Sequence, residues 1–309
     1  MKKPVKVVFG IDMETDVGSW TPFYEGLVRG TPRLLKLFAA KGVKVTTYWV
    51  AEAARKHPEV LRDVQSAGHE IGTHSLTHET VGQPLFDIPG IYPLLPHEVR
   101  PRIELATRIV ADTAGAQPVS WRCPRLFGGT AVTNALEDLG YTSDATYPMY
   151  FYEKRRYPYH PSRTDWTKPG RSRLIEIVQF ADMGLRSRDP HGRDRDQWPL
   201  YRTTSARQFA PHITSFLRYI EARDTKDTSA WPAVLCFYFH PWEFWKMPQG
   251  AIHYGEGAVL PDPFLVKGCG AYCLKQVGLL IDWLKSIGGE FQTAAECADE
   301  WRARLGERA

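Results

Sequence analysis

The sequence lacks paired cysteines, long hydrophobic runs and a strong excess of charge of either sign. Its five cysteines, at positions 123, 236, 269, 273 and 297, are odd in number and scattered, which is untypical of a disulfide-stabilised domain. No apolar stretch approaches the roughly 20 residues that a membrane-spanning helix needs. The segment MKKPVKVVFGID has no signal-peptide core, because Lys6 interrupts its apolar run and Asp12 ends it. These absences predict a reduced, cytoplasmic protein without a membrane partner.

The charge pattern argues against a nucleic-acid partner. The formal net charge is only +4 over 309 residues, and the basic residues are scattered rather than gathered in a stripe. The densest basic cluster, Lys154 to Arg156, is short. We therefore expect a small molecule or a saccharide as the ligand.

Strand-like and helix-like segments alternate along almost the whole chain. This alternation predicts parallel strands joined by crossover helices. About seven such units indicate a distorted or incomplete (β/α)7-type barrel, and we expect residues 1–309 to form a single domain with long aromatic loop insertions near 147–200 and 241–270. One of the crossover helices is expected to begin at Thr31-Pro32, since threonine is a good N-cap and proline suits the first helical position.

Side chains that could bind a metal or transfer protons lie at the ends of the predicted strands. In parallel barrels the carboxyl ends of the strands meet at one mouth, where active residues gather. Such side chains follow nearly every predicted strand. If their role were purely structural, they would be scattered over both ends of the strands. They are Asp12, Glu14, His74, His78, Arg122, Asp144 and His240.

The segment HSLTH places His74 and His78 four residues apart. Such spacing often arises by chance, so the pair gains weight only from the other residues at the strand ends. Two imidazoles and one carboxylate make a three-ligand site with open positions, which is typical of a hydrolytic metal centre rather than a structural one. A second carboxylate would then serve as a general base and a further histidine as a general acid.

Five motifs in order resemble the NodB-type polysaccharide deacetylases, including their allantoinase-like branch. The resemblance runs from about Val5 to Ala295. The motifs are FGIDMETD after the first strand, HSLTH, the R-x-P of Arg122 to Pro124, the looser Ser143-Asp144, and the apolar strand FYFH that ends at His240.

This resemblance implies a role for each matched residue. It implies that Asp12 is the general base, oriented by Arg122, and that His240 is the general acid, tuned by Asp144. It also implies a divalent metal, with zinc as our choice, held by His74 and His78. The family has adjacent aspartates in its first motif, whereas here Met13 follows Asp12, so we assign the third ligand to Glu14, with Asp16 as the alternative.

Aromatic residues near these motifs have two interpretations. Substrate contacts are expected from Trp20, Tyr24, Trp242 and Glu243, although the first two would equally well close the barrel. The tyrosines and phenylalanine between positions 147 and 159 could stack on sugar rings, anchor a loop in the core, or form a subunit interface in a homo-oligomer.

Three functions are compatible with these patterns. The first is a metal-dependent hydrolase that removes an N-acetyl group from an amino sugar or saccharide. The second is an allantoinase-like hydrolase of a ureide or cyclic amide. The third is a non-catalytic sugar-binding barrel, which the intact set of acid, base and ligand candidates disfavours.

Overall fold

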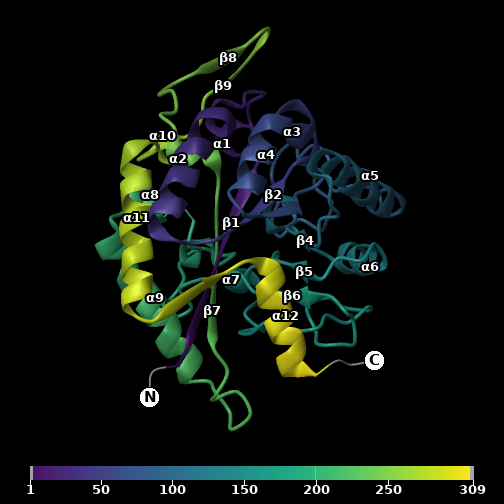
Figure 1. Cartoon of the computed structure of the whole chain (residues 1–309), viewed down its shortest axis with the longest axis vertical. Coiled ribbons are helices and arrows are strands. Elements are labelled where there is room, and N and C mark those ends of the chain that lie inside the picture. Colours follow the sequence, from purple (N-terminus) through teal and green to yellow (C-terminus); the bar gives the residue numbers. More distant parts are fainter. Residues whose placement is uncertain (1–2, 199, 307–309) are drawn as a thin grey trace.

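The computed structural model describes residues 3–198 and 200–306. A parallel sheet of eight strands curls around the centre of the molecule, with helices packed outside it (Figure 1). Its strands are β1 (Val5–Met13), β2 (Thr46–Trp49), β3 (Glu70–Thr73), β4 (Ser120–Trp121), β5 (Ser143–Asp144), β6 (Ile175–Glu176), β7 (Ala233–Phe239) and β10 (Gly289–Gln292). The predicted distorted barrel of parallel strands is confirmed.

The longer helices are α2 (Glu25–Lys41), α3 (Ala51–Lys56), α4 (Pro58–Ser66), α5 (Pro96–Ala114), α6 (Thr130–Asp138), α9 (Ala206–Glu221), α11 (Ala271–Ser286) and α12 (Ala294–Leu305). Short elements fill the loops: α1 (Asp16–Ser19), α7 (Met149–Tyr152), α8 (Leu200–Thr203), α10 (Pro263–Val266), and the 3-10 turns η1 (Pro124–Leu126), η2 (Arg193–Arg195) and η3 (Pro241–Phe244). Among the described residues, no helix combines the length and apolarity needed to cross a membrane.

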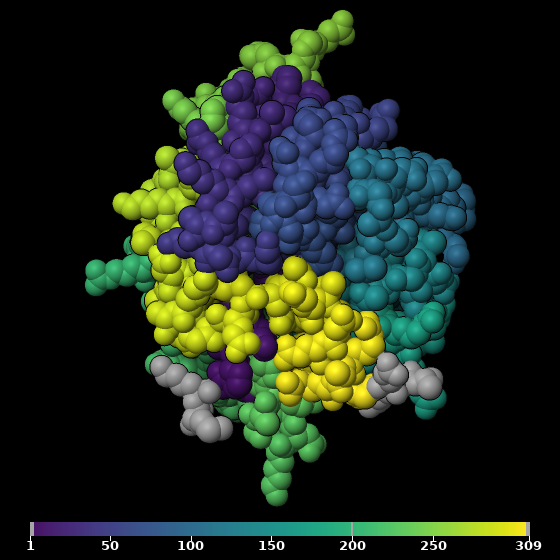
Figure 2. Space-filling view, viewed as in Figure 1, coloured from purple at the N-terminus to yellow at the C-terminus, as the bar shows by residue number. Residues whose placement is uncertain are grey.

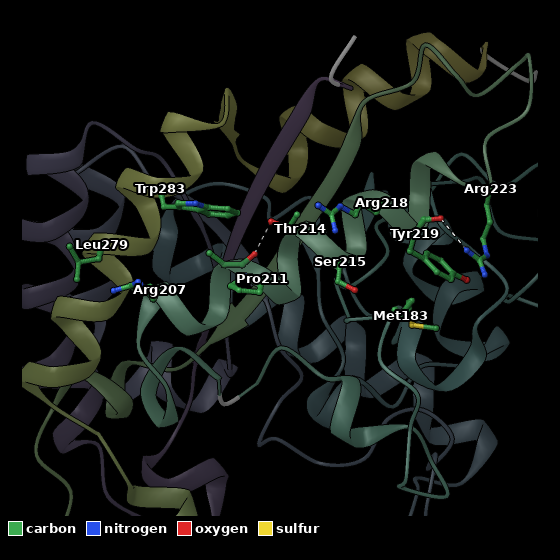
Figure 3. A pocket seen from close by; sticks show the side chains of 13 residues that line it. Met183, Arg207, Pro211, Thr214, Ser215, Arg218, Tyr219, Arg223, Leu279 and Trp283 are labelled. Atoms are coloured by element: carbon green, nitrogen blue, oxygen red, sulfur yellow. Dashed lines mark hydrogen bonds between the residues drawn. The ribbon is translucent and has the colours of Figure 1, made fainter.

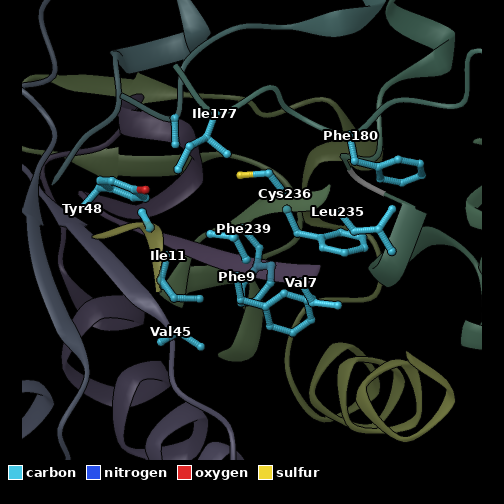
Figure 4. Close-up of a cluster of buried hydrophobic side chains, with 14 of the residues drawn as sticks. Val7, Phe9, Ile11, Val45, Tyr48, Ile177, Phe180, Leu235, Cys236 and Phe239 are labelled. Carbon is cyan, nitrogen blue, oxygen red and sulfur yellow. The ribbon is translucent and has the colours of Figure 1, made fainter. Parts of the chain in front are cut away.

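Strand β1 is the axis of the sheet, because it pairs in parallel with three strands. Its first half pairs with β10, its second half with β2, and its other edge with β7. Its apolar side chains pack among those of β2, β6 and β7, as the buried cluster in Figure 4 shows. Phe9, for example, makes edge-to-face contacts with Phe237 at 5.2 Å and Phe239 at 5.3 Å between ring centroids.

The ring of strands closes only weakly between β6 and β7. Gln179, beyond the end of β6, forms a single parallel bridge to Cys236 in β7, and the amide of Phe180 donates to the carbonyl of Cys236 at 3.0 Å. The other neighbours around the ring are joined by named strands. This thin closure is what makes the barrel distorted.

The start of helix α2 differs from the prediction. The helix begins at Glu25 rather than at Thr31, so Pro32 lies inside it. The cap comes from a distant residue: the Asp16 carboxylate accepts hydrogen bonds from the backbone amides of Glu25 at 3.0 Å and Gly26 at 2.8 Å. These bonds satisfy amides that the first helical turn leaves free, and no nearby sequence pattern reveals them.

A hairpin of β8 (Ile252–Tyr254) and β9 (Gly257–Val259) projects beyond the compact body (Figure 2). It follows η3, and so lies on the side of the barrel where the chain leaves β1 and β7 (Figure 1). This is the side on which the candidate site is built.

Candidate functional site

The carboxyl ends of the parallel strands bring the predicted residues together. Asp12 lies near the end of β1 and Glu14 just beyond it, whereas His74, Arg122 and His240 each come directly after a strand. Because all these strands run in the same direction, these side chains meet at one mouth of the barrel.

Glu14, His74 and His78 form a candidate metal centre. One donor atom from each residue lies within 4.8 Å of the others, and all three residues are buried. The Glu14 Oε2 atom is 2.7 Å from His78 Nε2 and 3.9 Å from His74 Nε2. Glu14 Oε1 is buried without a hydrogen-bond partner, which leaves a lone pair of this carboxylate available.

Neighbouring groups orient the two imidazoles. The Nδ1–H of His74 donates to the carbonyl of Arg122 at 2.8 Å, so that its Nε2 turns toward Glu14 with a lone pair available. A tight turn brings His78 back to the site: Ser75 and His78 have φ values of 72° and 64°, and Ser75 Oγ accepts a hydrogen bond from the His78 amide at 3.0 Å.

The charges of the centre suit a cation. Burial lowers the pKa of His74 to about 4, so this imidazole is neutral at pH 7. Burial also acts to raise the pKa of Glu14, but the imidazoles of His78, His240 and His74 hold it well below its usual range. Asp16, the alternative third ligand, instead caps α2, and burial raises its pKa to about 7.

Asp12 is held by a fully buried arginine. Arg122 donates from Nη1 to Asp12 Oδ1 at 2.8 Å and from Nε to the Ala145 carbonyl at 3.0 Å, and its guanidinium lies 4.3 Å from the ring centroid of Tyr48. Despite the opposing effect of burial, Asp12 raises the pKa of Arg122 above its already high value. A Cβ atom on Gly10 would lie 2.3 Å from the guanidinium, so glycine in β1 makes room for it.

The second carboxylate oxygen of Asp12, Oδ2, lies near both His74 and His240. Asp12 Oδ2 is 3.9 Å from His74 Nε2 and 3.9 Å from His240 Nε2. His240 Nε2 also lies 3.7 Å from Glu14 Oε1. The carboxylate held by Arg122 therefore stands between the candidate metal centre and His240.

The carboxylate that contacts His240 is Glu243, which corrects two expectations. His240 Nδ1 lies 3.2 Å from Glu243 Oε2, and this oxygen also accepts from the His240 amide at 2.9 Å. Glu243 is completely buried and is fixed by Arg202 Nε at 2.7 Å. It thus lies behind His240 rather than against a substrate, because η3 turns its side chain back toward the histidine.

Asp144, which we expected to tune His240, belongs to a different network. Its carboxyl accepts a hydrogen bond from the hydroxyl of Thr146 and lies beside Glu176, whose Oε1 accepts from the Tyr147 amide at 2.7 Å. Burial raises the pKa of Asp144 to about 7 and that of Glu176 well above its usual range. The two-residue strand β5 pairs with β6, so this carboxyl lies beside that of Glu176.

Burial acts to lower the pKa of His240, but Glu14, Glu243 and Asp12 together raise it to about 9. The pKa of Glu243 itself is lowered, because His240 and Arg202 outweigh the effect of burial. His240 is therefore protonated at neutral pH, with Nδ1–H bound to Glu243 and Nε2–H facing the site.

A cavity of about 470 Å³ opens onto these groups. Trp20 and Trp242, two of the expected substrate contacts, line it. Trp20 is 41% exposed, whereas Trp242 is 1% exposed and stacks on His240 at 5.4 Å between ring centroids. Tyr24 is not among the residues that line the cavity: its ring packs against His57 at 4.9 Å.

Sequence reasoning missed several residues of the cavity wall. They come from loops that cross the mouth of the barrel, and only the proximity of Arg125 to the R-x-P motif and of Tyr238 to His240 pointed to any of them: Phe86, Asp87, Arg125, Trp198 and Tyr238. Tyr150, from the aromatic segment for which sugar stacking was one interpretation, also lines the cavity, as do Arg193 and Asp196 from the loop insertion predicted near 147–200. Backbone strain also marks this region. Four of the seven described non-glycine residues with positive φ line the cavity: Val17, His78, Arg125 and Leu126.

A larger hollow of about 1010 Å³ lies on the outer surface, between α9 and α11 (Figure 3). Alkyl, hydroxyl, aromatic and guanidinium side chains line it, among them Arg207, Thr214 and Trp283. The described residues around it include no carboxylate and no imidazole, so it cannot supply the ligands or the acid and base found at the mouth of the barrel.

The structure is a parallel barrel with a carboxylate and two histidines at its mouth, and comparisons with known proteins find similar sequences and folds. A family model described as polysaccharide deacetylase matches residues 18–143. A peptidoglycan deacetylase from Helicobacter pylori is 30% identical over 92 residues, which are 26% of this chain and 31% of that protein. The aligned segment thus spans about a third of the length of that relative.

Solved structures match over nearly the whole chain. A probable polysaccharide deacetylase from Pseudomonas aeruginosa PAO1 superposes with a TM-score of 0.62 at 17% identity, covering 98% of this chain and 92% of that one. Puue allantoinase gives a TM-score of 0.62 at 19% identity, covering 98% and 91%. At these identities the likeness concerns the fold. Together with the family match, it confirms the predicted resemblance to polysaccharide deacetylases.

Proposed function

We propose that this protein is a metal-dependent hydrolase of a carbon–nitrogen bond outside peptides, and that it removes an N-acetyl group from an amino sugar or short saccharide. The proposal is carried by one observation. Asp12 Oδ2 lies 3.9 Å from both His74 Nε2 and His240 Nε2, so a base, a ligand set and an acid share one small space.

Glu14, His74 and His78 are the residues that would hold the metal ion. Two imidazoles and a carboxylate favour zinc among the divalent metals. When bound, such an ion lowers the pKa of a water molecule to about 7 and polarises the substrate carbonyl. The buried, unpartnered Glu14 Oε1 and the orientation of His74 by the Arg122 carbonyl fit this role.

The chain's own residues would move the protons. Arg122 holds Asp12 through Oδ1 and leaves Oδ2 free to take a proton from the attacking water. His240 would donate its Nε2 proton to the leaving amine nitrogen on the other side of the scissile bond. Glu243 holds the ring by Nδ1, so that the proton to be delivered is the one that faces the substrate.

The substrate class is supported by the relatives and by the rim of the cavity. The matched relatives carry the names peptidoglycan deacetylase and probable polysaccharide deacetylase. The half-exposed indole of Trp20 offers a flat face of the kind on which sugars stack. A second candidate is hydrolysis of a ureide or cyclic amide, favoured by the equal likeness to an allantoinase and by a cavity that suits a compact molecule.

Metal analysis and product assays test the proposal. We expect the purified protein to contain or bind a divalent metal and to release acetate from N-acetylglucosamine or its short oligomers. Turnover of allantoin without acetate release would favour the second candidate. Sugar binding without any turnover would favour a non-catalytic barrel.

Two variants separate the roles within the site. His74→Ala should lose metal and activity together, whereas Asp12→Asn should keep its metal and lose about 100-fold to 10,000-fold in turnover. Unchanged hydrolysis by His74→Ala would refute the metal mechanism. Loss of metal from Asp12→Asn would make Asp12 a ligand rather than the base.

A further inference from the structure

Arg125, three residues after Arg122, is built into the wall of the cavity. Its backbone has a φ of 57°, and Leu126 follows with 58°, a pair of left-handed conformations that side chains rarely adopt. Its Nη1 donates to the carbonyl of His78 at 3.1 Å, so the guanidinium is fastened to the residue that carries a ligand imidazole. The strained turn thus holds a cation beside the candidate metal centre.

The charge of Arg125 meets an aromatic ring rather than a carboxylate: its guanidinium lies 6.0 Å from the ring centroid of Trp20. The two fully buried guanidiniums nearby each meet a carboxylate: Arg122 meets Asp12 and Arg202 meets Glu243. Within the described part of the chain, no carboxylate lies at ion-pair distance from Arg125, and burial lowers its pKa against the weaker attraction of Glu14. Of its five N–H donors, the bond to His78 uses one.

The free donors face the cavity rather than the protein interior. Arg125 lines the cavity, and none of its nitrogens is among the described polar atoms that are sealed off without a partner. A mostly buried guanidinium with open donors is costly unless something completes its hydrogen bonds. A carboxylate matches its planar fork, because two parallel N–H···O bonds form at once.

We propose that Arg125 binds a carboxylate carried by the substrate, so that the natural substrate is an anionic N-acyl compound rather than a neutral sugar. This proposal rests on the hydrolase function proposed above. Because Arg125 bonds to the backbone carbonyl of His78, its guanidinium lies close to the candidate metal centre. The carboxylate that Arg125 binds would therefore belong to the same small molecule as the scissile amide.

The rest of the cavity wall is compatible with an anion. Arg193, which packs over Phe86 at 4.6 Å, adds a second guanidinium at the rim. Besides Asp12 and Glu14 of the candidate site, two aspartates line the wall, and one of them, Asp87, is exposed to solvent. Asp196 accepts a hydrogen bond from the Tyr238 hydroxyl, and burial raises its pKa to about 7, so it carries less negative charge than an exposed aspartate.

The test compares substrates that differ mainly by a carboxylate. The pairs are N-acetylglucosamine with N-acetylmuramic acid, its lactyl ether, and hydantoin with hydantoin-5-acetic acid, and kcat/KM is measured for the metal-loaded protein. We expect the carboxylate member of at least one pair to be preferred about tenfold or more. In Arg125→Gln that substrate should lose about 100-fold, while its neutral partner changes less than threefold. Arg125→Lys should retain part of the preference, because it keeps the charge but not the fork.

Arg207→Gln is the matched control, since it removes the same charge from the outer hollow between α9 and α11 (Figure 3). It should leave both members of each pair unchanged. Metal content and melting temperature of Arg125→Gln show whether its site remains intact. A wild-type protein that favours the neutral members, or an Arg125→Gln variant that slows both members equally, would overturn the proposal.

Calorimetry separates this proposal from the proposed function. If the wild type hydrolyses none of the four compounds, the hydrolase function fails for these classes, and binding of the same compounds decides the role of Arg125. Tighter binding of a carboxylate member by the wild type, lost in Arg125→Gln, would uphold it. Equal binding of both members, or none, would reject it.

Discussion

At the level of single residues, the partner of His240 lies three positions further along the chain, in the turn that His240 itself opens. Glu243 is fixed there by Arg202, and it also accepts from the indole of Trp198 and the hydroxyl of Tyr201. A buried anion with this many donors is held in one orientation, so the ring of His240 is as well. The family-like residue Asp144 is engaged elsewhere.

Glu243→Gln should therefore lower kcat about tenfold to 100-fold and shift the alkaline limit of activity to lower pH. The sign follows from charge: removing an anion beside His240 lowers the pKa that Glu243 helps to raise to about 9. The kcat–pH profile is the measurement, with Asp144→Asn as the comparison, expected to keep kcat within about threefold. The reverse pattern would return the tuning role to Asp144.

Arg122 and Arg125 show what single residues in a sequence can and cannot reveal. Arg122 follows a strand end and stood out in a motif, so its place near Asp12 was predictable. Arg125 lines the cavity because its backbone takes a left-handed conformation. Nothing in the sequence predicts this conformation for an arginine. Tyr24 and Glu243, which we expected to contact the substrate, do not line the cavity, because loop geometry rather than position after a strand decides where they point.

At the level of elements, helix α2 positions the loop that carries His240. A Cβ atom on Gly30 would lie 2.1 Å from the carbonyl oxygen of Pro241, and one on Gly26 would lie 2.1 Å from the Cα of Trp242. The helix and η3 thus meet backbone to backbone, one helical turn apart. The cap from Asp16 links the same helix to the segment that carries Glu14.

Gly30→Ala should push α2 and η3 apart and so displace His240. We expect a destabilisation of about 1–3 kcal/mol, typical of overpacking, together with a loss of turnover larger than the loss of metal binding. Ala40→Gly, at an exposed position of the same helix, is the control: it should cost about 1 kcal/mol in stability and leave kcat/KM unchanged. Melting curves and steady-state rates measure both, and equal effects of the two variants on turnover would contradict the positioning role.

At the level of the whole molecule, the order of elements was predictable because its cause is simple. Apolar β-branched runs alternate with amphipathic helices, and parallel pairing sends every strand end to the same mouth. The start of α2 was not predictable, because its cap, Asp16, comes nine residues ahead of it in the chain. The buried pair of Asp144 and Glu176 was also hidden, since two short strands bring these carboxyls together.

That pair predicts how the stability of the fold depends on pH. The pKa of Asp144 is raised in the folded state to about 7, so its contribution is fully present below the unfolded pKa of about 4 and is lost as pH rises through 7. Asp144→Asn should flatten the fall in the free energy of unfolding between pH 4 and pH 8, by on the order of 3 kcal/mol. Denaturant titrations across this range measure it. Asp63→Asn, at an exposed site, should parallel the wild type, and an Asp144→Asn curve that also does so would contradict the assignment.

The bridge between Gln179 and Cys236 marks a place where the barrel can open locally without global unfolding. The ring is joined there by this bridge, by the bond from the Phe180 amide to the Cys236 carbonyl, and by Gln197 Nε2, which donates to the carbonyls of Phe180 and Cys236. Opening of this joint would expose the thiol of Cys236, whose sulfur lies 3.8 Å from Arg122 Nη2. Alkylation of Cys236 under native conditions should accordingly outpace global unfolding. Because the guanidinium that holds Asp12 contacts this joint, local opening of the barrel would also disturb the carboxylate proposed as the proton acceptor.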